Sequence, residues 1–129
     1  MSPDACVHDA SAVLAVLRGE PGGEKAKKLL AGGHVSAVNL IEVLTRLADI
    51  GFTEDMLDTV RSGLEVTVHP LTADQARMAA LLRTPTRRRG LSLGDRACLA
   101  LAMERGATAV TTDRAWADLD IGVKVLVLR

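Results

Sequence analysis

Aromatic residues are nearly absent from this 129-residue sequence: they make up 2% of it, with one Trp, one Phe and no Tyr. RNA-recognition and single-strand-binding modules stack bases on aromatic platforms, so the composition argues against both classes. Two cysteines are too few for a disulfide scaffold, and no apolar run reaches the ~18 residues that span a bilayer. Nothing at the N-terminus resembles a signal peptide. We therefore expect a cytoplasmic protein with reduced thiols and no membrane partner.

Net charge is missing as well, because 16 Lys and Arg residues balance 16 Asp and Glu residues. Any contact with nucleic acid must then come from a local basic patch, since no basic field covers the whole surface. The chain is rich in hydrophobic residues, at 48%, and carries 25% charged residues, which is typical of a globular protein. Its length predicts a single domain over residues 1–129.

Short apolar runs alternate with longer helical patterns along the chain. The runs predict strands over residues 6–8, 34–36, 66–68, 108–111 and 123–128, with helices at 10–17, 24–30, 37–50, 53–61, 72–82 and 93–104. Strands separated by helices imply right-handed parallel crossovers and an α/β domain. The almost wholly apolar fifth run predicts a strand buried on both faces, and the unbroken apolar run 97–103 predicts a buried helix. Thr84-Pro85 is expected to end the fifth helix.

Four acidic residues stand where this architecture brings segments together. Asp9 follows the first strand, Glu42 is in the first turns of the next strand's helix, Asp95 opens the buried helix, and Asp113 follows the fourth strand. In an open parallel sheet the ligand site lies beyond the carboxyl ends of the strands, where the returning helices begin. We therefore expect all four carboxylates to collect at one edge of the sheet.

Each acid also has a purely local explanation. Asp9 and Asp113 suit helix N-caps, and both Asn39–Glu42 and Ser92–Asp95 fit the spacing of a capping box. Helix dipoles favour acids at these positions too. Capping accounts for the acids one at a time, but not for four of them at the predicted ligand edge. It also leaves unexplained why no Lys or Arg lies beside Asp9 to neutralise it.

Several carboxylates close together repel one another unless a cation joins them. Oxygen ligands without His or Cys suit Mg²⁺ or Mn²⁺. Zinc is disfavoured, because His8, His34 and His69 are scattered along the sequence and the cysteines form no paired motif. We expect His8 and His69 to be ordinary buried or edge residues of strands, and Cys98 to pack in the core.

The chain resembles the PIN-domain ribonucleases, and most closely the VapC toxins of bacterial type II toxin–antitoxin modules. Four stretches carry the resemblance, in order and at matching spacing: VHDASA at 7–12, SAVNLIEVL at 36–44, LSLGDRACLALA at 91–102 and VTTDRAW at 110–116. Each stretch alone is weakly specific, whereas the four in order are specific over nearly the full length. One departure is His8, where the family usually has an aliphatic residue.

This resemblance implies a three-layer PIN-like α/β fold, with a parallel five-stranded sheet of order 3-2-1-4-5 flanked by helices. It implies an Mg²⁺- or Mn²⁺-dependent endoribonuclease that cleaves tRNA or another structured RNA. The protein would be a homodimeric toxin silenced by a small antitoxin protein. The catalytic and metal-binding residues would be Asp9, Glu42, Asp95 and Asp113. Ser11 and Thr112 would support the metal site.

An arginine-rich segment, residues 83–90, comes directly before the Asp95 motif. Arg87, Arg88 and Arg89 suit contacts with RNA phosphates, although a solvated loop explains them equally well. Asp118 and Asp120 are additional acids that could assist the site or simply be solvated. The alternative function is a non-catalytic PIN-like module that binds RNA or protein, which the complete acid set argues against.

Overall fold

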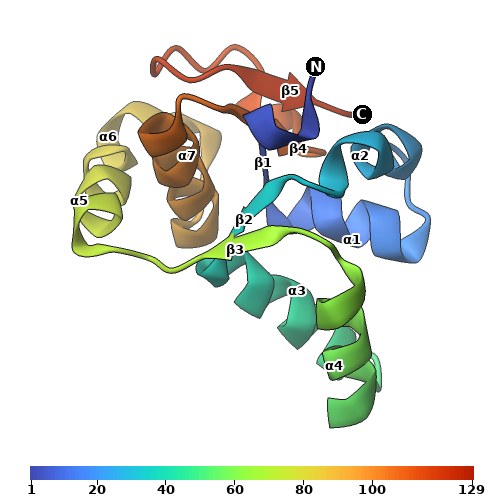
Figure 1. The fold of residues 1–129 in the computed structure, drawn as a ribbon. Coiled ribbons are helices and arrows are strands. Elements are labelled where there is room, and N and C mark those ends of the chain that lie inside the picture. The colour runs from blue at the N-terminus through green and yellow to red at the C-terminus, as the bar shows by residue number, and fades with distance from the viewer.

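Five strands form the centre of the fold in the computed structural model, which describes residues 1–129 (Figure 1). They are β1 (Cys6–His8), β2 (His34–Ser36), β3 (Thr67–His69), β4 (Thr108–Thr111) and β5 (Val125–Val127). Their order is β3-β2-β1-β4-β5, and every neighbouring pair is parallel. The predicted α/β class and the 3-2-1-4-5 order are therefore confirmed.

Helices connect the strands and cover both faces of the sheet. The connections are α1 (Ala10–Arg18), α2 (Gly23–Leu30), α3 (Ala37–Asp49), α4 (Glu54–Gly63), α5 (Ala73–Leu81), α6 (Arg83–Thr86) and α7 (Leu93–Arg105), with 3-10 turns η1 (Pro3–Ala5), η2 (Arg87–Arg89) and η3 (Arg114–Trp116). Figure 1 shows α1 and α2 on one side of the sheet and α5, α6 and α7 on the other. None of these helices is both long and apolar enough to cross a membrane.

Alternation along the two central strands supplies a core on each face of the sheet. Val7 of β1 and Ala109 of β4 pack with α7, while their neighbours Cys6 and Val110 pack with α1 and α2. The segment of α7 from Ala97 to Ala102 is buried throughout, which confirms the predicted buried helix. Full burial of one Leu or Val side chain contributes about 1.5–3 kcal/mol, so these layers hold the strand ends in fixed positions.

The edge strands differ from the sequence prediction. β5 is a half-buried edge strand over Val125–Val127, so the expected burial on both faces over 123–128 is wrong. Its ladder is limited to Ala109, Val110 and Thr111 of β4, and no further strand covers its other side. β3, the opposite edge, lies one residue later than predicted because its register with β2 pairs Ser36 with His69.

The arginine-rich segment is helical, contrary to the predicted break and loop. α6 covers Arg83–Thr86 and η2 covers Arg87–Arg89, while α5 ends one residue before the buried Leu82. Pro85 is the third residue of α6, where a backbone N–H would have no acceptor within the helix. Proline is tolerated there for that reason. After the last acidic motif, which contains Asp113, the chain forms only the single 3-10 turn η3.

Two of the histidines, although scattered along the sequence, lie together in the fold. The β2–β3 register places His34 and His69 on one face, with His34 Nδ1 2.8 Å from His69 Nε2. His34 Nε2 lies 3.1 Å from the Asp4 carboxylate. His8 is an ordinary buried histidine, as predicted: its Nε2 lies 2.9 Å from the Leu29 carbonyl oxygen, and burial lowers its pKa.

Candidate metal-dependent active site

The four predicted acids line a single groove of about 600 Å³ at the carboxyl ends of β1 and β4. Asp9 comes directly after β1, and Asp113 after β4; Glu42 and Asp95 come from the first turns of α3 and α7. These residues are far apart in sequence, and the parallel topology brings them to one sheet edge. The structure therefore gathers the acids as the sequence analysis expected.

Asp9 is the most constrained of these acids, with only 3% of its surface exposed. It is the N-cap of α1: Oδ1 accepts hydrogen bonds from Ala12 N (2.9 Å) and Ser11 Oγ (2.7 Å). Oδ2 accepts one from Thr111 Oγ1 at 2.5 Å. The pKa of Asp9 is raised to about 6: burial raises it most, these three hydrogen bonds partly lower it, and the nearby Asp95 raises it. Asp9 is therefore a buried carboxylate with no cationic side chain as partner.

Asp95 and Asp113 also cap helical turns. Ser92 Oγ accepts from Asp95 N (3.2 Å) while Asp95 Oδ2 accepts from Ser92 N (2.8 Å), which is the predicted capping box. Burial raises the pKa of Asp95, its bonds with Ser92 lower it, and Asp113 raises it. Asp113 Oδ1 accepts from Ala115 N at 2.9 Å and caps η3. Capping and convergence are therefore both correct, because the caps place these acids at the groove.

Glu42 is held in the groove by Asn39 rather than by a capping box. Ser36 is the N-cap of α3, so the predicted Asn39–Glu42 box is wrong. Asn39 is buried one turn into α3, and its Nδ2 donates to Glu42 Oε1 (2.8 Å) and to the Gly94 carbonyl oxygen (3.0 Å). Gly94 leaves room for this carboxylate, because a Cβ there would lie 2.6 Å from Glu42 Oε2. Asn39 thereby ties α3 to the start of α7.

Two hydroxyl groups donate hydrogen bonds to Asp9, and only one of the two residues, Ser11, was predicted to support the site. Ser11 Oγ donates to Asp9 and accepts from Thr112 N at 3.0 Å. The second hydroxyl belongs to Thr111, which also accepts from Asp113 N at 3.1 Å. Thr112, the predicted residue, contributes its backbone amide. Thr111 is the last residue of β4, as the predicted strand bounds already indicated, and its hydroxyl reaches Asp9.

The acids influence one another and a thiol below them. Cys98 is fully buried in α7, as predicted, with its Sγ 4.0 Å from the Val7 carbonyl oxygen. Burial raises the pKa of Cys98 well above its usual range, and the negative charges of Asp9, Asp95 and Glu42 raise it further. Cys98 thus lies under the acid cluster as an inert, neutral packing residue.

Arginines also line the groove, but they are not the ones singled out from the sequence. Three residues, Arg18, Arg46 and Arg129, form what we call the arginine rim. The exposed Arg87, Arg88 and Arg89 lie outside this lining; Arg89 Nη1 donates to the Ala117 carbonyl oxygen at 2.8 Å. Asp118 and Asp120 do not line the groove either.

The donor set fits a hard divalent cation better than zinc. No three His, Cys, Asp or Glu side chains are placed in this structure so that they could hold a metal ion together. Mg²⁺, however, keeps several waters and uses one or two carboxylates, so it does not require a closed protein cage. A buried, raised-pKa carboxylate such as Asp9, with Asp95 nearby, provides the oxygen ligands and the unbalanced negative charge that such an ion would offset.

A family model described as "PIN domain" matches residues 6–122. The chain therefore belongs to the PIN-domain family, which confirms the resemblance drawn from its four acidic motifs. A search of curated proteins finds no match.

Solved toxin–antitoxin structures share the fold. DNA-bound VapBC from Salmonella typhimurium has a TM-score of 0.77 at 17% identity, over 100% of both chains. VapC20 from Mycobacterium tuberculosis, described as a Sarcin-Ricin loop cleaving toxin, has a TM-score of 0.69 at 22% identity, over 92% of this chain and 98% of that one. VapBC-5 from the same species has a TM-score of 0.61 at 25% identity, over 97% of this chain and 98% of that one.

Proposed function

We propose that this protein is a metal-dependent endoribonuclease and the toxin component of a toxin–antitoxin pair. The observation that carries the proposal is the buried Asp9, in one groove with Glu42, Asp95 and Asp113. The reaction is hydrolysis of a phosphodiester bond in tRNA or another structured RNA. PIN-family membership and the toxin–antitoxin structures of the same fold support it.

Asp9 and Asp95 would be the main ligands of an Mg²⁺ or Mn²⁺ ion, with Glu42 and Asp113 contributing directly or through water. When bound, such an ion would supply an activated water and offset charge on the scissile phosphate. Ser11 and Thr111 keep the Asp9 carboxylate oriented, and Thr112 N holds the Ser11 hydroxyl. Asn39 restrains Glu42 at the opposite wall. The polypeptide supplies no nucleophile of its own.

RNA and protein partners complete the proposal. Exposed Arg87, Arg88 and Arg89 contact RNA phosphates, because their forked N–H groups match phosphate oxygens. A small antitoxin silences the toxin, as the VapBC complexes with this fold suggest. We further propose that the single domain acts as a homodimer in the cytoplasm. Its two free, buried cysteines are compatible with that reducing compartment.

Cleavage of RNA by the purified protein tests the proposal. We expect Mg²⁺-dependent cleavage that EDTA abolishes and that is lost in Asp95→Ala. Because Asp95→Ala also removes one of the two hydrogen bonds of the α7 capping box, Ser92→Ala is the control: it removes the other one, worth about 1 kcal/mol, but keeps the carboxylate. Ser92→Ala should therefore still cleave. Cleavage that survives Asp95→Ala comes from a contaminant, and no cleavage by the wild type favours the non-catalytic binding module.

A further inference from the structure

The arginine rim lines the same groove as the acids, and its members extend beyond them to different degrees. Arg18 is the last residue of α1, whose N-cap is Asp9, so about 14 Å of helix axis separates the two residues. Arg46 lies one turn beyond Glu42 on α3, and Arg129 follows Leu128, whose N donates to the Thr111 carbonyl oxygen at 2.9 Å. Three elements that are remote in sequence thus contribute guanidinium groups to the groove.

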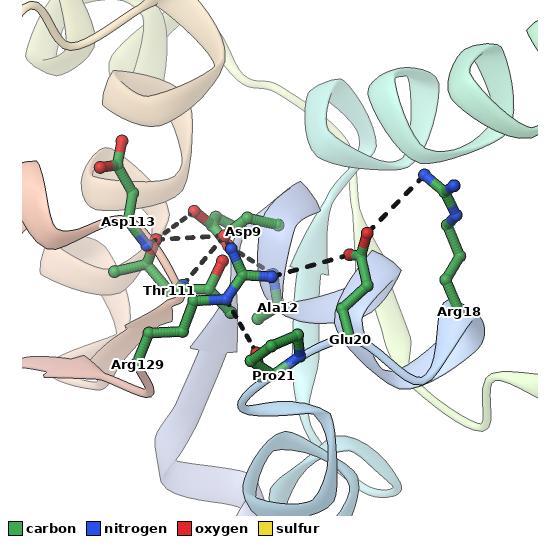
Figure 2. Close-up of polar contacts among 10 residues, drawn as sticks. Asp9, Ala12, Arg18, Glu20, Pro21, Thr111, Asp113 and Arg129 are labelled. Carbon is green, nitrogen blue, oxygen red and sulfur yellow. Dashed lines mark hydrogen bonds and ion pairs between the residues drawn. The ribbon is translucent and has the colours of Figure 1, made fainter.

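Glu20 lies between two of these guanidinium groups (Figure 2). Its Oε2 is 3.7 Å from Arg18 Nη1, and its Oε1 is 3.9 Å from Arg129 Nη2. Both distances exceed hydrogen-bond length, and the side chains are 34–36% exposed, so these ion pairs contribute little stability. Glu20 therefore keeps two like charges near each other without occupying their N–H donors.

Most rim donors are free to bind an anion. Arg129 Nε donates to the Pro21 carbonyl oxygen at 2.9 Å, which fixes the guanidinium plane and leaves its Nη groups available (Figure 2). Arg18 has only the weak pair with Glu20, and Arg46 has no carboxylate within 4.0 Å. A guanidinium presents five N–H donors in a planar fork that matches two oxygens of a phosphate.

We propose that the arginine rim is a subsite for RNA backbone phosphates beyond the scissile one. This inference rests on the proposed function, because it assumes that the substrate is a polyanion with its reacting phosphate at the acids. The whole groove lining holds six carboxylates against three guanidinium groups, and its net negative charge repels such a substrate. The guanidinium groups of the rim offset part of this repulsion. Because phosphates carry no sequence information, the rim positions the strand and does not select bases.

The salt dependence of RNA binding tests this subsite. An Asp95→Asn background prevents cleavage, and a short fluorescein-labelled single-stranded RNA in Mg²⁺ buffer is titrated between about 0.05 and 0.2 M salt. In that background, Arg18→Ala, Arg46→Ala and Arg129→Ala are combined. Loss of three contacts should lower the slope of log K against log salt by about 2. Binding at 0.1 M salt should weaken by about tenfold or more.

Two matched variants make the result specific. Arg61→Ala with Arg77→Ala and Arg105→Ala removes the same charge from exposed positions outside the groove, and its slope should change by less than about 0.7. Lys at the three rim positions should keep the parent slope, because the charge is retained. If the Ala variant loses its helical circular dichroism, Gln at the same positions gives the same test.

Equal slopes for the rim and control variants would overturn the inference, even if the wild-type protein cleaves RNA. A wild-type protein that cleaves no RNA would instead remove the proposed function, whatever the binding slopes are. The two failures are therefore distinguishable.

Discussion

The acids and the arginine rim hold charge in opposite ways within one groove. Asp9 is buried, accepts three hydrogen bonds and has a raised pKa. The Arg18 and Arg129 side chains are about one-third exposed, and their only ion pairs are the long ones with Glu20. Burying a charge costs free energy and restrains the group, whereas an exposed charge costs little and stays mobile. The acids are thus suited to a small cation, and the arginine rim to a flexible polyanion.

The largest expected effect is that of Asp9→Asn. Asn keeps the size of the side chain and an oxygen that accepts from Ala12 N, so the fold should persist while the cation loses its buried ligand. We expect cleavage to fall by a factor of about 10³ or more, the scale of removing a catalytic electrostatic group. RNA cleavage in Mg²⁺ measures it. Asp118→Asn, outside the groove, should cleave like the wild type; an Asp9→Asn protein that also did so would contradict the mechanism.

The pH dependence of stability comes next. The pKa of Asp9 rises from 3.8 to about 6 on folding, so the folded protein binds this proton more tightly than the unfolded chain. This group therefore makes the metal-free protein less stable as pH rises from about 4 to 6, by about 3 kcal/mol in total. His8 acts in the opposite direction, because burial lowers its pKa and stability is lost as pH falls below its ordinary range.

Comparing wild type with Asp9→Asn isolates the Asp9 contribution, since His8 and Asp95 are present in both proteins. Urea unfolding in EDTA should show that the wild type loses stability relative to Asp9→Asn between pH 4.5 and pH 7. A difference that stays constant across this range would show that burial of Asp9 does not disfavour its charged form.

Release of Glu42 has a smaller predicted effect. In Asn39→Ala, Glu42 loses its Nδ2 donor and α3 loses its link to the Gly94 carbonyl oxygen. Removing a group that positions a metal-site residue typically costs 10- to 100-fold in activity or metal affinity, and we expect a loss in this range. The Mg²⁺ concentration for half-maximal cleavage should rise in Asn39→Ala. An unchanged metal requirement would assign Asn39 to helix packing alone.

Much of the fold followed from the sequence because its signals are local. The strands 6–8, 34–36 and 108–111 have the predicted bounds, since each is a short apolar run next to a capping residue. The N-cap of α3 was predicted less well. Asn39 has the same spacing from Glu42 whether it caps a helix or lies within one, and the observed N-cap, Ser36, shows that it lies within the helix.

The acids of the site were also predictable from the sequence, whereas the arginine rim was not. The acids each follow a strand or open a helix, so the topology alone brought them together. The arginine rim has no such pattern, because Arg18 and Arg129 meet through Glu20 only after the chain has folded. Thr111 and Thr112 are adjacent and chemically alike, and the strand bounds, although predicted correctly, did not by themselves show which of the two hydroxyls reaches Asp9.

The last variant, Thr111→Val, tests the hydroxyl that donates to Asp9. The change keeps the shape of the side chain but removes the donor to Asp9 Oδ2, so the pKa of Asp9 should rise further. Loss of a hydrogen bond to a buried charge should cost about 1.5–3 kcal/mol of stability at neutral pH in metal-free protein. Carboxyl ¹³C NMR titration reports the pKa directly. An Asp9 pKa that falls or stays the same in Thr111→Val would contradict the assigned hydrogen bond.

A calorimetric titration with Mn²⁺ or Mg²⁺ tests the central claim most directly, because it measures the cation without requiring the correct RNA. The account predicts saturable binding to the wild type and to Asp118→Asn, and loss of that binding in Asp9→Asn. Absence of cation uptake by the wild type, both alone and with RNA present, would contradict it.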